Sequence, residues 1–469
     1  MMCIKNGFLL PVVLLVLDSV VADPLAAQTF KVLHNFSGSD AANPNGALVL
    51  AGDTLYGTTK AGGSSGFGTV FAINTDGSGF RTLHTFFGLS DGAYPLAGLI
   101  FSGETLYGTT TQNGDFGNGT VFSINTNGTG FVTLYAFSSG SDGSEPAGNL
   151  LLQGSVLYGT ADLGGDYGKG VVYALNTNGT GFTTLYSFSG ATDGSLPFCN
   201  LQLSGNKTLI GTTTRGGNAD EGTVFAINTD GSGFTNLYSF GARSDLAPYT
   251  NSDGAHPFCG LTQSEGNLYG ATAFGGSAGQ GTLFKLNTDG TGFTTLYSFT
   301  PTSNGTNSDG GEPGILPGEG LTLSGSTLYG TAPVGGSSGN GTAFAINIDG
   351  SGFTLLHTFS GGSDGALPNN GLVLSGGTLY GTAFQSSAAG GNGTIFSISL
   401  LASQPPQLTI TSAGANVILS WPIGFTLQST TNLASPVWTT NLPAPVVING
   451  QNTVTNPVSV SQQFFRLSQ

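Results

Sequence analysis

The chain has 469 residues, of which only 7% are charged, while 79 are glycine. A hydrophobic content of 38% excludes a disordered chain, which would combine low hydrophobicity with high charge. The formal net charge is −15 with only 10 lysines and arginines, which argues against nucleic acid as a partner, because its binding needs basic patches.

The N-terminus has the pattern of a secretory signal peptide, which we expect over residues 1–27. Lys5 supplies the positive charge, and small residues at Ala22 and Ala27 offer cleavage positions. The apolar run between Lys5 and Ala22, which Asp18 interrupts, is too short for a good membrane span. We therefore expect an exported, monomeric protein without a transmembrane segment after signal removal. It would lie outside the cell or on the cell surface, with the periplasm as an alternative.

A five-residue phrase, leucine-tyrosine-glycine-threonine-threonine or a close variant, recurs along the middle of the chain. Its seven copies begin at residues 55, 106, 157, 209, 268, 328 and 379. Self-similarity at a spacing of 51 to 60 residues indicates a repeat architecture.

Each copy belongs to a unit for which the sequence predicts four strands. In the first unit the strands are expected over 46–52, 53–62, 67–74 and 79–87. An Asp-Gly turn at 76–77 is a strong hairpin signal, and no helical period is present. Small or apolar residues on both faces, as in 69–73, suit strands that lie between neighbouring sheets. Four strands per unit match a propeller blade.

The two ends of the repeat region predict a closed ring. The chain enters at 29–36 with a phrase that matches the fourth strand at 79–86, and the last unit ends after its third strand at 393–398. The N-terminal strand would complete the last blade and hide the sheet edges that an open array exposes. The predicted fold is therefore all-β, a seven-bladed β-propeller over 28–400 that the N-terminal strand closes.

A second domain is expected after a proline-containing linker at 401–406. Apolar residues alternate with polar ones over part of 407–469, for example at Leu419 and Trp421. This pattern predicts a small C-terminal β-sandwich of the immunoglobulin or fibronectin type, although the segment is short for such a fold.

The repeated phrases, including GTVFAINTDGSGF at 68–80, resemble the tandem repeats of a family of exported bacterial proteins. These are the GloVer-type repeat or "choice-of-anchor" proteins. The resemblance covers roughly residues 30–400 and identifies the repeat. It implies no established enzymatic activity or cofactor. Members often carry a C-terminal anchor, and no such signal is visible in this sequence.

The loops on one rim of the predicted ring vary between repeats, and binding sites tend to lie on such loops. Each loop between blades keeps an aspartate and a proline, which we call the Asp–Pro frame. The aspartates are Asp40, Asp91, Asp142, Asp193, Asp253, Asp309 and Asp364. The residues before the proline are Asn43, Tyr94, Glu145, Leu196, His256, Glu312 and Leu367. A fixed frame with a varied tip is typical of a recognition surface, and loop drift is the alternative.

Two of these loops, 241–259 and 300–319, are longer than the others and flank the fifth blade. We therefore expect a specific site on this side of the variable rim. The candidate ligand-binding residues are Tyr94, Glu145, Arg243, Tyr249, His256, Asn304 and Glu312.

No metal-binding or catalytic residue is predicted. One aspartate per blade is better explained by a turn than by Ca²⁺, which needs six to eight converging oxygens, although calcium stays an alternative. His34, His84 and His357 share a position with tyrosines of other blades, which indicates packing. Glu145 and Glu312 would lie roughly 20 Å apart, too far for a glycosidase pair.

Cys199 and Cys259 occupy the same position of neighbouring units, at the start of the predicted innermost strand. In an exported protein they would form a disulfide or remain two buried thiols, and the sequence leaves both open.

These features predict a secreted, non-catalytic binding or scaffold propeller whose ligand is a glycan or, next in order, a protein. The first alternative is a hydrolase or lyase that acts on extracellular polysaccharide, with its site on the enlarged rim around blade five. The second is a structural component of the envelope.

Overall fold

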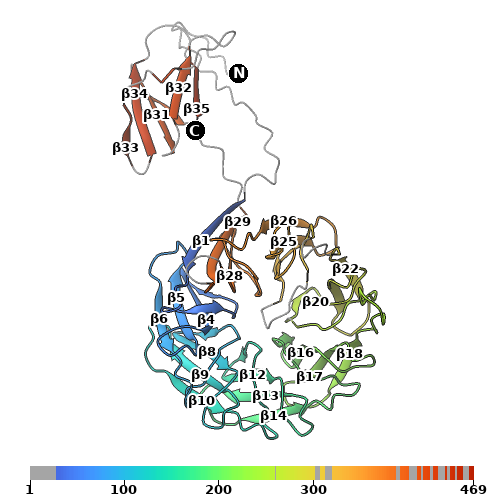
Figure 1. Ribbon diagram of the computed structural model, residues 1–469. Coiled ribbons are helices and arrows are strands. Elements are labelled where there is room, and N and C mark those ends of the chain that lie inside the picture. Colours follow the sequence, from blue (N-terminus) through green and yellow to red (C-terminus); the bar gives the residue numbers. More distant parts are fainter. Residues whose placement is uncertain are drawn as a thin grey trace. The chain divides into compact units, whose positions relative to one another are not determined.

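A computed structural model describes residues 28–258, 260–301, 307–311, 320–386, 391–400, 409–413, 416–422, 426–430, 439–440, 444–448, 451–457 and 464–468. They belong to two compact units, one of which is Phe30–Ser399 while the other includes Leu400–Gln469 (Figure 1). The predicted signal peptide at 1–27 and the predicted linker at 401–406 lie outside the described residues and stay predictions. The described part of the chain contains no apolar helix of membrane-spanning length.

The Phe30–Ser399 unit is all-β in its described part, as predicted, and consists of four-stranded antiparallel sheets that follow one another around a ring (Figure 1). The first sheet contains β3 (Val49–Ala51), β4 (Thr54–Ala61), β5 (Thr69–Asn74) and β6 (Arg81–Thr85), and β2 (Ala42–Pro44) also pairs with β4. Each strand lies within its predicted range.

The sheets that follow repeat the order of the first. Their strands are β7 (Ile100–Ser102), β8 (Thr105–Thr110), β9 (Thr120–Asn125) and β10 (Val132–Ala136); β11 (Leu151–Gln153), β12 (Val156–Ala161), β13 (Val171–Asn176) and β14 (Thr183–Ser187); β15 (Gln202–Ser204), β16 (Thr208–Thr213), β17 (Thr223–Asn228) and β18 (Thr235–Ser239); β19 (Thr262–Ser264), β20 (Asn267–Thr272), β21 (Thr282–Asn287) and β22 (Thr294–Ser298); β23 (Thr322–Ser324), β24 (Thr327–Ala332), β25 (Thr342–Asn347) and β26 (Thr354–Thr358); and β27 (Val373–Ser375), β28 (Thr378–Ala383) and β29 (Thr394–Ser399), which β1 (Thr29–Asn35) joins.

The first strand of the first sheet, β3, is shorter than predicted, because the residues directly before it, Asn45 and Gly46, contact the next sheet. Before β3, the Asn45 amide donates to the carbonyl oxygen of Leu96 over 3.2 Å. At Gly46 a Cβ atom would lie 2.4 Å from the carbonyl oxygen of Ala97. Close contact with the backbone of the next sheet therefore takes the place of strand pairing in the first part of the expected strand.

The glycine of the repeated phrase makes room for an aromatic ring in its own sheet. Gly57 pairs with Phe71 across β4 and β5, and a Cβ atom at Gly57 would lie 2.6 Å from Cζ of Phe71. The same conflict recurs at Gly108 with Phe122 and at Gly211 with Phe225. The glycine therefore lets the ring lie over the second strand, where both faces are buried.

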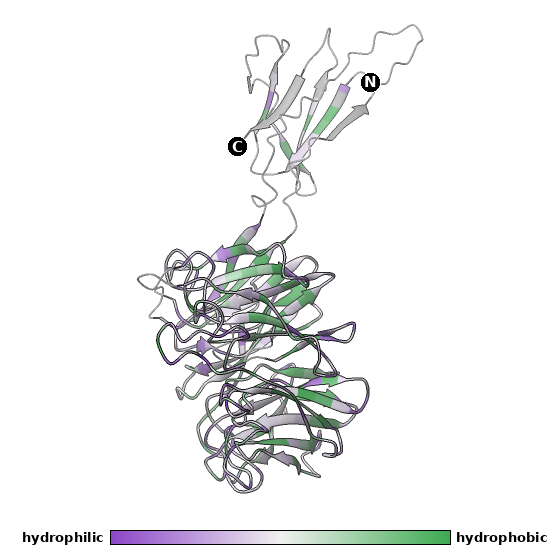
Figure 2. Cartoon of the chain, turned by 90° about the vertical axis from the view of Figure 1, so that its right-hand side faces the viewer, coloured by the Kyte–Doolittle hydropathy of each residue, from purple (hydrophilic) through white to green (hydrophobic). Residues whose placement is uncertain are grey.

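The hydrophobic core lies between neighbouring sheets. Tyr56 and Val70 of the first sheet pack with Leu106 and Phe122 of the second, and every residue of 69–73 is buried. Hydrophobic residues accordingly lie along the strands, while hydrophilic residues gather in the connecting loops (Figure 2). Both faces of these strands are covered, as the sequence predicts.

Neighbouring sheets are also joined by stacked aromatic rings. The histidine or tyrosine of each fourth strand stacks on a phenylalanine just before or at the start of the fourth strand of the next sheet. The pairs, with their centroid distances, are His34–Phe80 (3.9 Å), His84–Phe131 (3.8 Å), Tyr135–Phe182 (4.0 Å), Tyr186–Phe234 (3.9 Å), Tyr238–Phe293 (4.2 Å), Tyr297–Phe353 (4.1 Å) and His357–Phe30 (3.7 Å). The predicted packing role of this position is therefore specific, since it links one sheet to the next.

The N-terminal strand β1 is the fourth strand of the last sheet and pairs with β29. The Phe36 amide donates to the carbonyl oxygen of Gly393 over 3.1 Å. Phe36 is fully buried in a cluster that holds Leu55 of the first sheet together with Tyr380 and Ile395 of the last. Residues from the two ends of the repeat region therefore share one core.

The C-terminal unit contains a four-stranded sheet and a two-stranded sheet in its described part. The first has the order β30 (Thr409–Ala413), β31 (Asn416–Pro422), β34 (Gln451–Pro457) and β33 (Val446–Ile448), and the second pairs β32 (Thr426–Thr430) with β35 (Phe464–Ser468). Leu419, Trp421, Leu427 and Val454 are buried. The immunoglobulin- or fibronectin-like sandwich itself stays a prediction.

The fourth residue of the repeated phrase provides a test of how the sheets are joined. Thr58 donates its Oγ1 hydrogen to the carbonyl oxygen of Ala97 in the next sheet over 2.7 Å. Thr109, at the same position one sheet later, is buried, and its Oγ1 has no hydrogen-bond partner among the described residues. We expect Thr58→Val to lower the free energy of unfolding by about 1 kcal/mol and Thr109→Val to leave it unchanged or raise it. Urea denaturation measures both, and equal losses would contradict the assigned bond.

Candidate functional site

The variable rim is built on the aspartates of the Asp–Pro frame. The Asp142 carboxylate accepts hydrogen bonds from the Tyr135 hydroxyl (3.1 Å), from the Ser138 amide (2.7 Å) and from the Gly140 amide (3.1 Å). Burial and the charge of Asp142 raise the pKa of Tyr135 to about 12, which keeps its hydroxyl protonated as a donor. The carboxylate therefore ties the start of the loop to the fourth strand that precedes it.

Every frame aspartate is paired in this way with the histidine or tyrosine of the fourth strand. The pairs are Asp40–His34 (3.0 Å), Asp91–His84 (3.3 Å), Asp142–Tyr135 (3.1 Å), Asp193–Tyr186 (3.1 Å), Asp253–Tyr238 (2.9 Å), Asp309–Tyr297 (2.6 Å) and Asp364–His357 (3.2 Å). The predicted structural role of the aspartates agrees with these contacts. Most of these bonds run to the preceding strand and to backbone amides before the aspartate, while Asp40 also accepts from the Ala41 amide that follows it over 2.7 Å.

The residue before the proline has the same unusual backbone in every described loop. Its φ angle lies between 53° and 57° at Asn43, Tyr94, Glu145, Leu196, His256 and Leu367. This left-handed conformation costs a residue with a Cβ atom roughly 1–2 kcal/mol and costs glycine nothing. The chain uses glycine freely elsewhere, so the retained side chains indicate that this position serves a purpose other than folding. Glu312, the remaining member, lies outside the described residues.

Two further variable positions meet this residue at each junction between sheets. At the third sheet, the Glu145 amide donates to the carbonyl oxygen of Asn118 (2.9 Å), which precedes β9. The Asp162 amide, directly after β12, donates to the carbonyl oxygen of Glu145 (3.3 Å). The backbone is therefore fixed, while the three side chains at a junction are free to differ from those at other junctions.

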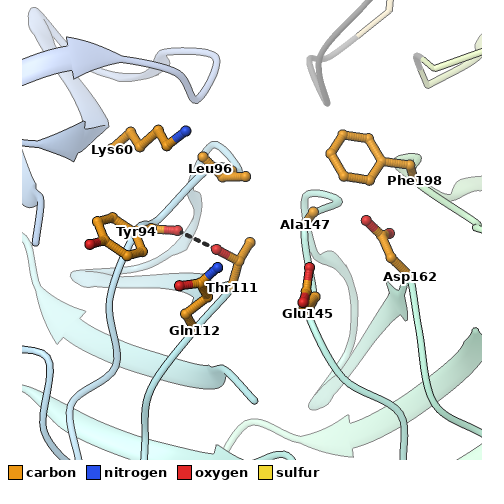
Figure 3. A pocket seen from close by; sticks show the side chains of 9 residues that line it. All are labelled: Lys60, Tyr94, Leu96, Thr111, Gln112, Glu145, Ala147, Asp162 and Phe198. Atoms are coloured by element: carbon orange, nitrogen blue, oxygen red, sulfur yellow. Dashed lines mark hydrogen bonds between the residues drawn. The ribbon is translucent and has the colours of Figure 1, made fainter. Parts of the chain in front are cut away.

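A pocket of about 390 Å³ opens among these junctions (Figure 3). The loops and strand ends of four consecutive sheets contribute to it. Its lining residues are Lys60, Tyr94, Leu96, Thr111, Gln112, Glu145, Ala147, Asp162 and Phe198. Two of the predicted ligand-binding residues, Tyr94 and Glu145, are thus brought together, with apolar, aromatic and acidic side chains around the same space.

Asp162 is the least expected residue of this pocket. It is only 6% exposed, and its Oδ1 atom has no hydrogen-bond partner among the described residues. Burial, reinforced by the charge of Glu145, raises the pKa of Asp162 well above its usual range. The carboxyl group is directed at the pocket beside Glu145, which is half-buried (Figure 3). A buried polar group without a partner is costly, so it calls for an explanation.

One feature of the sequence distinguishes Asp162, although the comparison of the loops between blades did not reveal it. The residue directly after the repeated phrase varies between sheets: Lys60, Thr111, Asp162, Thr214, Ala273, Pro333 and Phe384. Asp162 is the single acidic residue at this position. The sequence analysis compared the loops between blades and did not single out this position.

A second cluster lies at the junction before β19. The Arg243 Nε atom donates to both carboxylate oxygens of Glu221 over 3.0 Å, and Nε2 of His256 lies 3.0 Å from Oε2 of Glu221. The Arg243 guanidinium also lies 5.6 Å from the centre of the Phe274 ring. Arg243 and His256, both predicted site residues, therefore meet through Glu221, which the sequence did not single out.

This cluster fastens the long 241–259 loop more clearly than it offers a binding surface. His256 is 4% exposed, and Glu221 is also buried. Tyr249, from the same loop, is 52% exposed and takes no part in these contacts with Glu221. Asn304 and Glu312 of the second long loop lie outside the described residues. A site around blade five thus stays a prediction.

The pKa of His256 makes this loop sensitive to acid. Burial first, and then the charges of Arg215 and Arg243, lower its pKa to about 4, with Asp220 acting in the opposite direction. An unfolded histidine titrates near 6.5, so the unfolded state binds more protons between these values, and stability falls as the pH drops through this window. His256→Asn should flatten that fall, since Asn43 holds the same left-handed position elsewhere. Thermal melts across this pH range measure it, and an unchanged slope would refute it.

Cys199 is buried, and its Sγ atom accepts a hydrogen bond from the Thr212 amide over 3.2 Å. The Thr160 hydroxyl donates to its carbonyl oxygen over 3.0 Å. Cys259 lies outside the described residues, so the candidate disulfide between the two stays a prediction.

The antiparallel four-stranded sheets, the fixed Asp–Pro frame and the variable junctions define a propeller-like repeat protein. The chain belongs to the Gloeobacter/Verrucomicrobia repeat family, whose pattern matches residues 22–161 and 139–314. None of the curated protein sequences matches the chain.

Several solved structures are similar to this chain at low sequence identity. An oligogalacturonate lyase in complex with manganese has a TM-score of 0.50 and 10% identity, over 81% of this chain and 94% of that chain. An oligogalacturonate lyase from Vibrio parahaemolyticus has a TM-score of 0.48 and 10% identity, over 81% and 98%. A putative 6-phosphogluconolactonase from Bacteroides uniformis has a TM-score of 0.42 and 15% identity, over 90% and 99%. At these identities the similarity concerns the fold alone.

Proposed function

We propose that this chain is an exported, monomeric binding protein, a seven-bladed β-propeller with a small C-terminal β-sandwich. It binds an extracellular glycan without transforming it, in the pocket that Tyr94, Glu145, Asp162 and Phe198 line. The sheet order supports the architecture, because β1 supplies the fourth strand of the sheet that contains β27, β28 and β29. The signal-peptide pattern at 1–27 supports export.

The observation that carries the binding role is the buried carboxyl group of Asp162. Its Oδ1 atom lacks a hydrogen-bond partner among the described residues, and an unsatisfied buried polar group costs about 1–3 kcal/mol. A purely structural component would gain stability by replacing it. A bound ligand that donates hydrogen bonds to it removes the cost.

The other lining residues suit a saccharide. Tyr94 and Phe198 offer aromatic surface, and Glu145 and Gln112 offer polar groups, which is the usual composition of small-ligand pockets: apolar walls with a few placed polar atoms. Both aromatic rings are held by neighbours: Tyr94 meets Phe67 edge-on at 5.7 Å, and Phe198 meets Phe258 edge-on at 6.1 Å. Rings that are fixed before binding lose little entropy when the ligand arrives.

A second candidate function, a hydrolase or lyase acting on extracellular polysaccharide, is favoured by one observation. Glu145 and Asp162 are adjacent carboxyl groups, and the environment raises the pKa of Asp162 well above its usual range. Pairs of this kind serve as acid and base in catalysis. In this second candidate the reaction takes place in the pocket rather than on the rim around blade five.

A glycan-panel screen on the purified chain tests both candidates when binding and product formation are measured together. Saturable binding without turnover, lost in Glu145→Gln, is the expected result. Glu104→Gln is the matched control, because Glu104 makes the same charge change at the exposed turn between β7 and β8. Turnover that Glu145→Gln abolishes would replace the binding role by the enzyme, and absence of any binding would refute both.

A further inference from the structure

We propose that the pocket selects saccharides that carry a free amino group and seats the ammonium between the carboxyl groups of Glu145 and Asp162. This inference rests on the proposed binding function and specifies its ligand class. The ligand would be an amino sugar whose nitrogen is not acylated.

The carboxyl groups of Glu145 and Asp162 favour a ligand that offers hydrogen-bond donors and positive charge. Asp162 is nine-tenths buried, faces the pocket, and its Oδ1 has no partner among the described residues. An ammonium offers three hydrogen-bond donors and a full positive charge, while a hydroxyl offers one donor and no charge. Two adjacent carboxyl groups in a partly buried site repel each other when both are ionised, and a cation between them relieves this repulsion.

The protonation of Asp162 leads to the same expectation about the ligand. Because burial and Glu145 raise the pKa of Asp162, its carboxyl group keeps a proton to higher pH than an ordinary aspartate does. An ammonium that enters supplies the positive charge in place of that proton. Binding should therefore release a proton, which a neutral sugar has no reason to do.

The walls of the pocket also favour an organic cation. Tyr94 and Phe198 line it, and aromatic faces attract cations more strongly where water is excluded. Lys60, the basic residue of the lining, is drawn in Figure 3 on the side away from Asp162. The net charge of −15 further raises the local concentration of cationic ligands.

A metal ion fits the same residues less well. Calcium takes six to eight oxygen ligands, whereas the lining supplies two carboxyl groups, and the Thr111 hydroxyl already donates to the carbonyl oxygen of Tyr94 over 2.9 Å. The described part of the chain contains no group of three or more histidine, cysteine, aspartate or glutamate side chains placed to hold a metal. An ammonium needs fewer ligands than an ion of this kind.

Isothermal titration calorimetry with two matched ligands tests the inference. Oligomers of β-1,4-linked glucosamine are compared with N-acetylglucosamine oligomers of the same length, at mildly acidic pH where the free amines are protonated. We expect the free-amine oligomer to bind roughly tenfold or more tightly. Its binding heat should differ between buffers of different ionisation enthalpy, in the direction of proton release.

Variants separate the site from attraction to an acidic protein in general. Asp162→Asn and Glu145→Gln should remove the preference and the proton release, while Glu104→Gln and Asp115→Asn, both at exposed positions, should keep them. Equal or tighter binding of the acetylated oligomer would overturn the inference and leave the proposed function standing. Binding that persists in all four variants would also overturn it. Absence of binding by either oligomer and by the whole glycan panel would refute the proposed function itself.

Discussion

Phe36→Ala is expected to lower the free energy of unfolding of the repeat unit by about 3–5 kcal/mol. Phe36 is fully buried, lies edge-on to Phe71 at 5.5 Å, and belongs to the core that the first and last sheets share. The truncation leaves a cavity at the point where β1 must hold the two ends of the repeat region together. Chemical denaturation measures the loss.

Phe86→Ala is the matched control, because Phe86 is fully buried at the same position after β6. The two cavities should cost similar amounts, but the consequences differ. In Phe36→Ala, hydrogen exchange measured by mass spectrometry should rise selectively in β1 and β29, since β1, unlike the fourth strands of the other sheets, does not follow its paired strand in the chain. Unchanged protection of these two strands would contradict a ring that depends on β1.

Asp162→Asn is expected to stabilise the protein at neutral pH, because a neutral amide replaces a carboxyl group whose ionised form is disfavoured by burial and by the charge of Glu145. The folded state raises the pKa of Asp162, so between the unfolded and folded pKa values the folded state binds more protons. Stability therefore falls as the pH rises through this window, and the penalty is absent below the unfolded value near 3.9. The gain from Asn should shrink as the pH is lowered.

Thermal melts of both proteins across this pH range measure the effect. Asp166→Asn, at an exposed position of the following loop, should leave the pH dependence unchanged. A loss of stability in Asp162→Asn at neutral pH would mean that the carboxylate already has a buried partner, which would remove the main reason to regard it as a ligand group.

The repeat made most of the fold predictable. Copies of one phrase, the Asp-Gly or Asn-Gly turns and burial on both faces made the strands predictable, and those of the first sheet lie within their predicted ranges, because local sequence dictates turns and strand faces. The fourth-strand phrase at 29–36 identified the partner of the last sheet. The shortened first strand of the first sheet was not predictable, since it follows from contacts between backbones of neighbouring sheets, as at Gly46 and Ala97.

The site was predictable only where it lies on the loops. Tyr94 and Glu145 were predicted because they break a fixed pattern, and both line the pocket, while their role in binding stays a prediction. Asp162 and Glu221 were missed, because they sit at the edges of strands whose neighbours repeat closely. The environment of both residues is made by side chains at a junction between neighbouring sheets. Burial of Asp162 and the ion pair of Glu221 with Arg243 depend on residues that are distant in sequence.

The frame aspartate and the histidine or tyrosine of the fourth strand were interpreted separately, one as a turn residue and the other as packing. They form one hydrogen-bonded pair in each sheet, for example Asp142 with Tyr135. The signal was present in the sequence, because every repeat that has one residue also has the other. Comparing positions with each other, instead of one at a time, would have found it.

Because the backbone before each proline has the same left-handed conformation, side chains at this position can be exchanged between junctions. Leu196 and Thr214 hold the places of Glu145 and Asp162 one sheet later, and the Thr214 amide donates to the carbonyl oxygen of Leu196 over 3.0 Å. A second acidic pair could therefore be transplanted there, as Leu196→Glu with Thr214→Asp, without altering the backbone. A repeated scaffold of this kind lets new binding specificities arise by exchange of these side chains, while the residues that determine the fold stay the same in every repeat.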